Sequence, residues 1–392
     1  MKNVPGFLLS GVSAGLKKDG KKDLALIFST TPARASAIFT KNLIKGAPLL
    51  VAQERLSGGF CQALIINSVN ANAYTGRKGY EDALSVANAL SARLRIDESL
   101  VIPSSTGVTG EWLRVGKIKK SIPILTKNLG ESNFHEAAEA IMTTDSFPKY
   151  ASRQLVVGEK TATISAIGKG AGMICPNMAT MLCFIMTDLN VQRKALSKAL
   201  AKAASGSFNA ITVDGDTSPN DSVFILANGV LANRQITEKS GDYGRLVEVL
   251  SSLCAEIAEM IVRDGEGATK VVRINVTEAR NEVDAEKVAR TIATSQLVKT
   301  AFYGEDANWG RIVAAAGRAG VGFDPEKIKL YFEGVEVFSK GIRSKPESRF
   351  AYVFKKPSFT VTLSLGEGEA VYSILTSDLS HKFVSINSDY RT

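Results

Sequence analysis

The sequence predicts a layered sandwich of helices and strands, of the α/β or α+β class, rather than a barrel. Predicted strands and helices are interspersed along the chain, two strands often follow each other, and strict strand–helix–strand repeats are few. The 392 residues, of which 45% are hydrophobic and 22% charged, can bury a sizeable core. Length alone allows one large domain or two to three ordinary ones, and no long Pro/Gly/Ser linker marks a boundary.

Eight segments predict strands because they alternate or run apolar over a short stretch between Gly, Pro or Asp residues. They are residues 24–29, 62–68, 161–168, 181–188, 222–228, 271–277, 359–365 and 370–376. Four segments have apolar residues at helical spacing, which predicts helices over 82–94, 193–204, 245–264 and 284–302. The third is the strongest, because Leu246, Leu250 and Leu253 share one stripe and Gly265 follows its end.

Charge and composition narrow the class of partner. The net charge is +9, but the basic clusters at 17–22 and 117–120 are short, mixed with acids and free of interleaved aromatics, so we expect neither nucleic acid nor a membrane as partner. No apolar run reaches the roughly 18 to 20 residues of a membrane helix, and the amino terminus is too weakly apolar for a secretory signal. Four cysteines without framework spacing fit a reduced compartment, so the sequence predicts a cytoplasmic protein.

The stretch KGAGMICPNMATML, residues 169–182, places a lone hydroxyl, Thr180, at the start of a buried apolar run. If the Ala179–Thr180 bond were cut, the free α-amine of Thr180, with a pKa of about 7.7 to 8, could serve as general base for its own hydroxyl. The same hydroxyl could make the cut by an N-to-O acyl shift, helped by small Ala179 and the preceding Pro-Asn turn. Alternatively, Thr180 simply opens a strand, where threonine has good propensity. The residues alone leave both interpretations open.

Only His135 and His381 are available, so we do not expect a His-rich metal site, and a Ser-His-Asp triad would depend on one of two residues. The segments 213–221 and 302–312 are rich in Asp and Asn, but neither has the loop spacing of an oxygen-ligand metal site. We therefore expect no metal, and we interpret both segments as polar turns that support a site from behind.

The junction around Thr180 resembles the self-processing junction of the ornithine acetyltransferase family, the bifunctional glutamate N-acetyltransferases of arginine biosynthesis. Further motifs match this family in the same order and cover nearly the whole chain. They are SSTGVTG (104–110), TTDSFPK (143–149), FNAITVDGDTSPND (208–221), RDGEGATK (263–270), FYGEDANWGRI (302–312) and INSDYRT (386–392). The resemblance implies the layered fold that this family shares with self-processing aminopeptidases.

The resemblance also implies a ping-pong reaction, in which N-acetylornithine acetylates Thr180, ornithine leaves, and glutamate takes the acetyl group. It makes Thr106 and Gly107 the oxyanion-stabilising pair. It implies that the substrate contacts are Thr143, Lys169, Thr180, Glu266, Asn387 and Thr392, with Thr144 an alternative to Thr143. It further implies fragments 1–179 and 180–392, which form one intertwined body, and an assembly of two such pairs. No cofactor is implied, although acetyl-CoA is a second donor in some members.

The residues themselves fit these roles without requiring them. Lys169 continues as Gly-Lys-Gly, which excludes a phosphate-binding loop, and its ammonium suits a substrate carboxylate, although it could be a solvated loop lysine. Glu266 between two glycines could pair with the cationic side chain of ornithine, or be a polar loop residue. Thr106 and Gly107 could present an O–H beside an N–H, or form an ordinary surface turn.

Three residues depart from the family pattern: Val69 and Tyr74 stand where relatives commonly have Gly and Cys, and His381 lies in an altered carboxyl-terminal segment. None of them is a catalytic position. Two other functions remain open at this point. One is a self-processing amidase or aminopeptidase, which would use water as acyl acceptor. The other is a non-enzymatic basic binding module whose Ala179–Thr180 bond stays intact.

Overall fold

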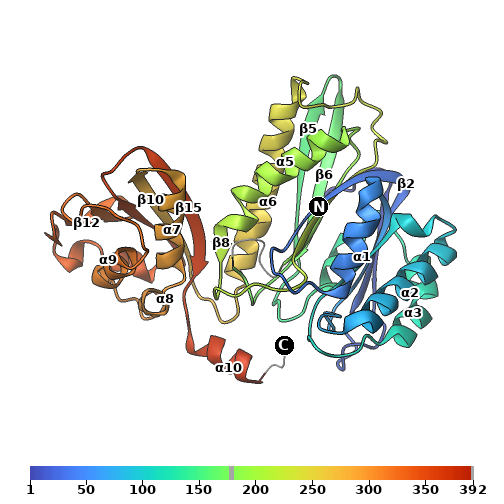
Figure 1. Cartoon of the computed structure of the whole chain (residues 1–392), viewed down its shortest axis with the longest axis horizontal. Helices are drawn as coiled ribbons and strands as arrows, with labels where there is room; N and C mark the ends of the chain where they lie inside the picture. Colours follow the sequence, from blue (N-terminus) through green and yellow to red (C-terminus); the bar gives the residue numbers. More distant parts are fainter. Residues whose placement is uncertain (176–180, 390–392) are drawn as a thin grey trace.

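The computed structural model describes residues 1–175 and 181–389, and within them it confirms a layered fold of helices and strands built on two sheets (Figure 1). The first sheet has eight strands in the order β4-β3-β2-β9-β7-β6-β5, and β1 adds to β2. Their bounds are β1 Phe7–Val12, β2 Leu24–Phe39, β3 Phe60–Asn67, β4 Val101–Ser105, β5 Lys149–Val157, β6 Lys160–Lys169, β7 Leu182–Thr187 and β9 Ser222–Ala227.

The second sheet has seven strands among the described residues, in the order β13-β12-β11-β14-β10-β15-β8. Their bounds are β8 Ile211–Thr212, β10 Val271–Ala279, β11 Lys329–Phe332, β12 Val335–Ser339, β13 Ile342–Arg343, β14 Ser358–Ser364 and β15 Ala370–Ser377. This sheet forms a lobe with its own apolar core, which the sequence did not predict (Figure 1, orange). We call the first sheet and the helices that cover it the first body. The short strand β8 joins the lobe to this first body, because it pairs with β15.

Helices cover both faces of the first sheet, and further helices pack on the core of the second sheet. Their bounds are α1 Ala47–Arg55, α2 Gly76–Leu94, α3 Val115–Lys127, α4 Phe134–Ala140, α5 Arg193–Ser205, α6 Asp242–Arg263, α7 Glu282–Ala293, α8 Gln296–Tyr303, α9 Trp309–Gly317 and α10 His381–Asp389. In β7, Cys183 and Ile185 face the core under α5 and α6, whereas Phe184 and Met186 face the opposite core. Burial on both sides explains why this strand is uniformly apolar.

The predicted single helix over 284–302 is wrong, because the structure has α7 and α8 there. The break falls at Thr294 and Ser295. Thr294 donates its hydroxyl to the Arg290 carbonyl at 2.8 Å, and Ser295 is extended, with ψ of 113°. A hydroxyl that competes for a backbone carbonyl favours helix ends over helix interiors. The apolar periodicity continues through the break because both helices pack on the same core.

The predicted division into 1–179 and 180–392 lies outside the described residues, since positions 176–180 are not described. The strands on either side of it interleave in the first sheet. β7 and β9 follow the division in the chain, yet they lie between β6 and β2, which precede it. A cut at this point would therefore leave two fragments that share one sheet. Across residues 1–175 and 181–389, none of the helices is both long and apolar enough to cross a membrane.

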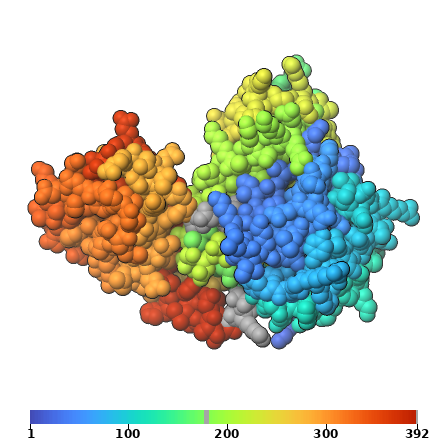
Figure 2. Space-filling model, viewed as in Figure 1, coloured from blue at the N-terminus to red at the C-terminus, as the bar shows by residue number. Residues whose placement is uncertain are grey.

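The helix α10 extends from the second lobe toward the first body and lies below the junction between them (Figures 1 and 2, red). Hydrogen bonds secure the segment that precedes it. Asp378 accepts from the backbone N–H groups of Thr269 and Lys270 at 2.8 and 3.0 Å, and the Ser380 hydroxyl donates to the Gly267 carbonyl at 2.6 Å. The carboxyl-terminal segment is thus fastened to the loop that follows α6.

Candidate functional site

A cavity of about 200 Å³ lies at the ends of β4 and β6. The loops around residues 143, 214–220 and 266 and the helix α10 complete its lining. Segments far apart in the sequence contribute its lining. Six residues predicted as site residues line it: Thr106, Gly107, Thr143, Lys169, Glu266 and Asn387. The remaining three, Ala179, Thr180 and Thr392, lie outside the described residues. The structure therefore brings every described candidate to one place.

The chain directly after Thr180 is fixed beside this cavity. Met181 is buried, and its N–H donates to the Asp221 carboxylate at 3.2 Å. Leu182, the first residue of β7, pairs in register with Lys169, the last residue of β6. The strand that follows Thr180, the predicted nucleophile, thus begins opposite Lys169, a predicted substrate contact.

Thr106 and Gly107 follow β4, an edge strand in which Pro103 is tolerated because one side of an edge strand needs no donor. Thr106 is 6% exposed, and its N–H donates to the Asn67 carbonyl at 3.0 Å. Gly107 has φ of +126°, a conformation that L side chains rarely adopt. The alternative of an ordinary surface turn is wrong, because this turn is packed against the residues after β3.

If Gly107 has the oxyanion role that the family resemblance implies, replacing it by alanine should lower kcat for acetyl transfer by about 10²- to 10³-fold, the cost of one lost oxyanion donor. A Cβ atom at Gly107 would lie 2.2 Å from the Val69 carbonyl carbon and 2.4 Å from its oxygen, so the turn must move. Gly110→Ala is the matched control, since it has φ of +75° in the same loop and open space around a Cβ. Equal kcat values for the two variants would contradict this role of Gly107.

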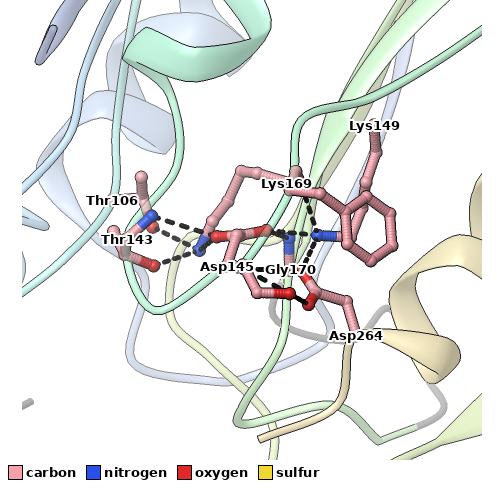
Figure 3. Close-up of polar contacts among 9 residues, drawn as sticks. Thr106, Thr143, Asp145, Lys149, Lys169, Gly170 and Asp264 are labelled. Atoms are coloured by element: carbon pink, nitrogen blue, oxygen red, sulfur yellow. Dashed lines mark hydrogen bonds and ion pairs between the residues drawn. The ribbon is translucent and has the colours of Figure 1, made fainter.

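Lys169 is buried, which rules out a solvated loop lysine. Its ammonium donates to the Thr143 hydroxyl at 2.8 Å and to the Thr106 hydroxyl at 3.3 Å, and it lies 3.9 Å from the Asp145 carboxylate (Figure 3). Because Thr106 accepts from the lysine, its own hydroxyl hydrogen can be donated to a ligand. Thr143 and Thr144 both line the cavity, and Thr143 is the one bonded to Lys169. Burial lowers the pKa of Lys169, while Asp145 raises it.

Glu266 lies three residues after the end of α6, and its backbone N–H donates to the Ala171 carbonyl at 2.9 Å. Its carboxylate accepts from the Asn387 side chain at 2.8 Å, which joins two predicted contacts that are 121 positions apart. Gly172 makes room for it, since a Cβ at Gly172 would lie 2.5 Å from the Glu266 carboxyl carbon. Glu266 is thus a buried cavity residue rather than a polar residue of an exposed loop.

The segment 213–221 takes a direct part in the cavity, which was not predicted from the sequence. It was expected to support the site from behind, but Asp214, Asp216 and Asn220 line the cavity itself. Burial raises the pKa of Asp214 to about 6. The closely spaced aspartates were the sequence signal that could have indicated this direct part.

The other Asp- and Asn-rich segment, 302–312, lies in the second lobe, where Asn308 caps α9 by accepting from the Arg311 N–H at 3.2 Å.

In the described part of the chain, no group of three His, Cys, Asp or Glu residues is arranged to hold a metal ion. The cavity instead offers hydroxyl and ammonium donors from Thr106, Thr143 and Lys169 together with the carboxylates of Glu266 and Asp214. Groups of both charges suit a small ligand that carries a carboxylate and an ammonium group.

Two of the residues that depart from the family pattern adopt left-handed backbone conformations. Val69 has φ of 79° and Tyr74 has φ of 61°, which is strained for a β-branched or bulky residue. The Val69 carbonyl accepts from the Val108 N–H at 2.8 Å, so this residue contacts the turn that carries Gly107. His381 begins α10 and packs edge-on against Tyr303, with ring centroids 5.5 Å apart. His381 therefore serves packing between α10 and α8.

Comparison with known proteins gives one consistent result. A model of the ArgJ family matches residues 8–392. The chain is 49% identical over 395 residues to the arginine biosynthesis bifunctional protein ArgJ of Syntrophotalea carbinolica, and 45% identical over 392 residues to that of Geobacter sulfurreducens, with complete coverage of each. A crystal structure of the ArgJ protein from Bacillus halodurans matches with a TM-score of 0.51 at 36% identity. The match covers 53% of this chain and 98% of that chain, so the solved chain is about half as long.

Proposed function

The chain belongs to the ArgJ family, and from this premise we propose that it transfers an acetyl group from N-acetylornithine to glutamate in arginine biosynthesis. One observation supports the proposal above others: Thr106, Gly107, Thr143, Lys169, Glu266 and Asn387, which come from separate segments, line a single cavity. The relatives at 42–49% identity carry the name of the biosynthetic protein, which does not favour an amidase, an aminopeptidase or a binding module.

In the proposed reaction, the α-amine of Thr180 takes the proton from the Thr180 hydroxyl, and the oxygen attacks the acetyl carbonyl of N-acetylornithine. The oxyanion accepts hydrogen bonds from the Thr106 hydroxyl and the Gly107 N–H. The proton passes to the leaving nitrogen, ornithine departs, and an acetyl ester remains on Thr180. The amine of glutamate then attacks this ester, which yields N-acetylglutamate and restores the hydroxyl.

The cavity residues divide the recognition of the substrate in this proposal. Lys169 pairs with the α-carboxylate that both amino acids share, and Thr143, bonded to Lys169 at 2.8 Å, donates to the same group. Glu266 pairs with the side-chain ammonium of ornithine, and Asn387, at 2.8 Å from Glu266, holds that carboxylate in place. Thr392 completes the site as a further substrate contact.

Cleavage of the Ala179–Thr180 bond would produce the free amine that this chemistry requires. Two findings support such processing. The strands that flank the junction interleave in one sheet, so two fragments would stay together. The solved relative is a chain of about half this length, as one fragment would be. We further propose two copies of each fragment in the assembly and a cytoplasmic location. We also propose that acetyl-CoA is an additional acetyl donor, because the relatives are named bifunctional.

The test is incubation of the purified protein with N-acetylornithine and glutamate, followed by chromatographic assay of N-acetylglutamate, ornithine and acetate. We expect N-acetylglutamate and ornithine in equal amounts, and only when both substrates are present. Release of acetate at the same rate with and without glutamate would instead identify a hydrolase and overturn the proposal. The same assay with acetyl-CoA in place of N-acetylornithine tests the second donor.

A further inference from the structure

A cluster of buried charges lies directly behind Lys169, and the proposed mechanism does not use it (Figure 3). Its centre is Lys149, whose side chain is 0% exposed and whose ammonium bridges the carboxylates of Asp145 and Asp264. The distance from Lys149 Nζ to Asp145 Oδ1 is 2.7 Å. A wholly buried lysine between two carboxylates is uncommon, because removing three charges from water is costly unless each is paired.

Asp145 ties together the two segments that carry Thr143 and Lys169. Its carboxylate accepts from the Thr143 N–H at 3.0 Å and from the Gly170 N–H at 2.7 Å. The same carboxylate lies 3.9 Å from Lys169 Nζ. One acidic side chain thus joins the backbones of these two segments and supplies the nearest negative charge to Lys169.

Asp264 extends the same cluster to the loop that carries Glu266. It lies two residues before Glu266, directly after the end of α6. Its carboxylate accepts from the Ser146 N–H at 3.0 Å and from Lys149. The loop that carries Glu266 is therefore joined to the segment of Thr143 through an ion pair that is out of contact with solvent.

We propose that Asp145, Lys149 and Asp264 are positioning residues that hold Lys169 in place and together set how readily it keeps its proton, so that it can bind the substrate carboxylate. This proposal rests on the function proposed above. The three side chains do not touch substrate; they act through Lys169. The sign of each charge decides whether it favours or opposes the protonated form of Lys169: Asp145 attracts the Lys169 ammonium, and Lys149 repels it.

The electrostatics of Lys169 agree with this arrangement. Burial lowers the pKa of Lys169, Asp145 raises it and Lys149 lowers it; the other charged groups that face it, Glu266 and Asp221, both raise it. Burial alone would raise the pKa of Asp145, but Lys169 and Lys149 hold that pKa below its usual range. Asp145 therefore stays ionised and opposes the loss of the Lys169 proton.

The test is the pH dependence of kcat/KM for N-acetylornithine in Asp145→Asn and Lys149→Met, two substitutions that keep shape and remove opposite charges. The α-amine of this substrate is acetylated and does not titrate, and its side-chain ammonium titrates alike with every variant. A difference in the alkaline limb between variants therefore reports Lys169, and the acidic limb reports the Thr180 amine. Asp145→Asn should move the alkaline limb down by about 1 pH unit, and Lys149→Met should move it up by about 1. The acidic limb should stay in place in both.

At the pH optimum of the wild type, Asp145→Asn should also raise KM for N-acetylornithine by about tenfold, with kcat changed less than KM. A role confined to folding would lower activity in both variants without moving the alkaline limb in opposite directions. Asp242→Asn and Lys198→Met are the matched controls, since both residues form exposed ion pairs on helices away from the cavity. Neither control should change KM or the pH profile.

Asp264→Asn is the milder variant if removal of a charge at 145 or 149 prevents folding. It keeps Asp145 and should move the alkaline limb in the same direction as Asp145→Asn, by a smaller amount. An alkaline limb at the wild-type pH in any folded, active variant of the three would overturn the proposal. Absence of transfer by the wild-type protein would instead refute the proposed function, so the two failures are distinguishable.

Discussion

Thr180→Ala should yield a single full-length chain of 41.9 kDa and a loss of acetyl transfer on the order of 10⁴-fold or more. Alanine removes the hydroxyl that is proposed to cut the chain and to carry the acetyl group, so both functions should fail together. Without the cut, the amine that serves as general base also remains an amide. A denaturing gel, amino-terminal sequencing and the transfer assay measure the three consequences on one preparation.

Thr180→Ser is the matched control, because it keeps a hydroxyl at the same position. It should restore cleavage and part of the transfer activity, whereas the alanine variant should keep the fold, since neighbouring Met181 is held by Asp221 and by pairing of the strands. In the wild type the two fragments should elute as one species, because β7 and β9 lie between β6 and β2. Turnover by Thr180→Ala, or active wild-type enzyme whose sole amino terminus is Met1, would contradict the mechanism.

Strands buried on both faces were predictable from the sequence, and strands defined by tertiary pairing were not. β7 and β9 are continuous apolar runs, and every residue in them is buried. β4 was missed because it is short and contains Pro103, which argues against a central strand but is allowed at the edge where β4 lies. β8 has two residues and exists only through its pairing with β15. No local pattern could have indicated it.

The helix α10 was missed for a different reason. None of its nine residues, 381–389, is buried. Its three apolar residues, Phe383, Val384 and Ile386, are too few and the segment too short for the apolar periodicity that signals a helix. Its place is determined instead by the hydrogen bonds of Asp378 and Ser380 before it and of Asn387 near its end. These partners lie more than 100 positions away in the chain, beyond any sequence window.

The candidate site also has a part that was predictable from the sequence and a part that was not. Motif resemblance identified the residues that line the cavity, because each lies within a distinctive short segment. It did not identify the cluster behind them, although Asp145 and Lys149 belong to one of those segments. A lysine is almost always exposed, so its burial could not be expected from sequence. Its partner Asp264 is 115 positions from Lys149, and only the fold brings them together.

Removal of residues 387–392 should abolish acetyl transfer and leave the fold intact. Asn387 holds the Glu266 carboxylate at 2.8 Å, so the truncated protein loses both the amide that orients this group and the proposed contact Thr392. The anchors of the carboxyl-terminal segment, Asp378 and Ser380, precede the cut and remain. Because α10 buries no residue, loss of its last turn removes little apolar contact. Thermal unfolding of the truncated protein should therefore resemble that of the wild type.

The matched substitutions on α10 separate a role of Asn387 from a role of the helix as a whole. Asn387→Ala should raise KM for N-acetylornithine, because Glu266 loses a hydrogen bond that orients it toward the ornithine ammonium. Val384→Ser changes a side chain of the same helix that is 63% exposed, and it should leave kcat and KM unchanged. If the truncated protein is soluble, cleaved into two fragments and fully active, the carboxyl terminus has no part in the site, and Glu266 must be oriented by the first body alone.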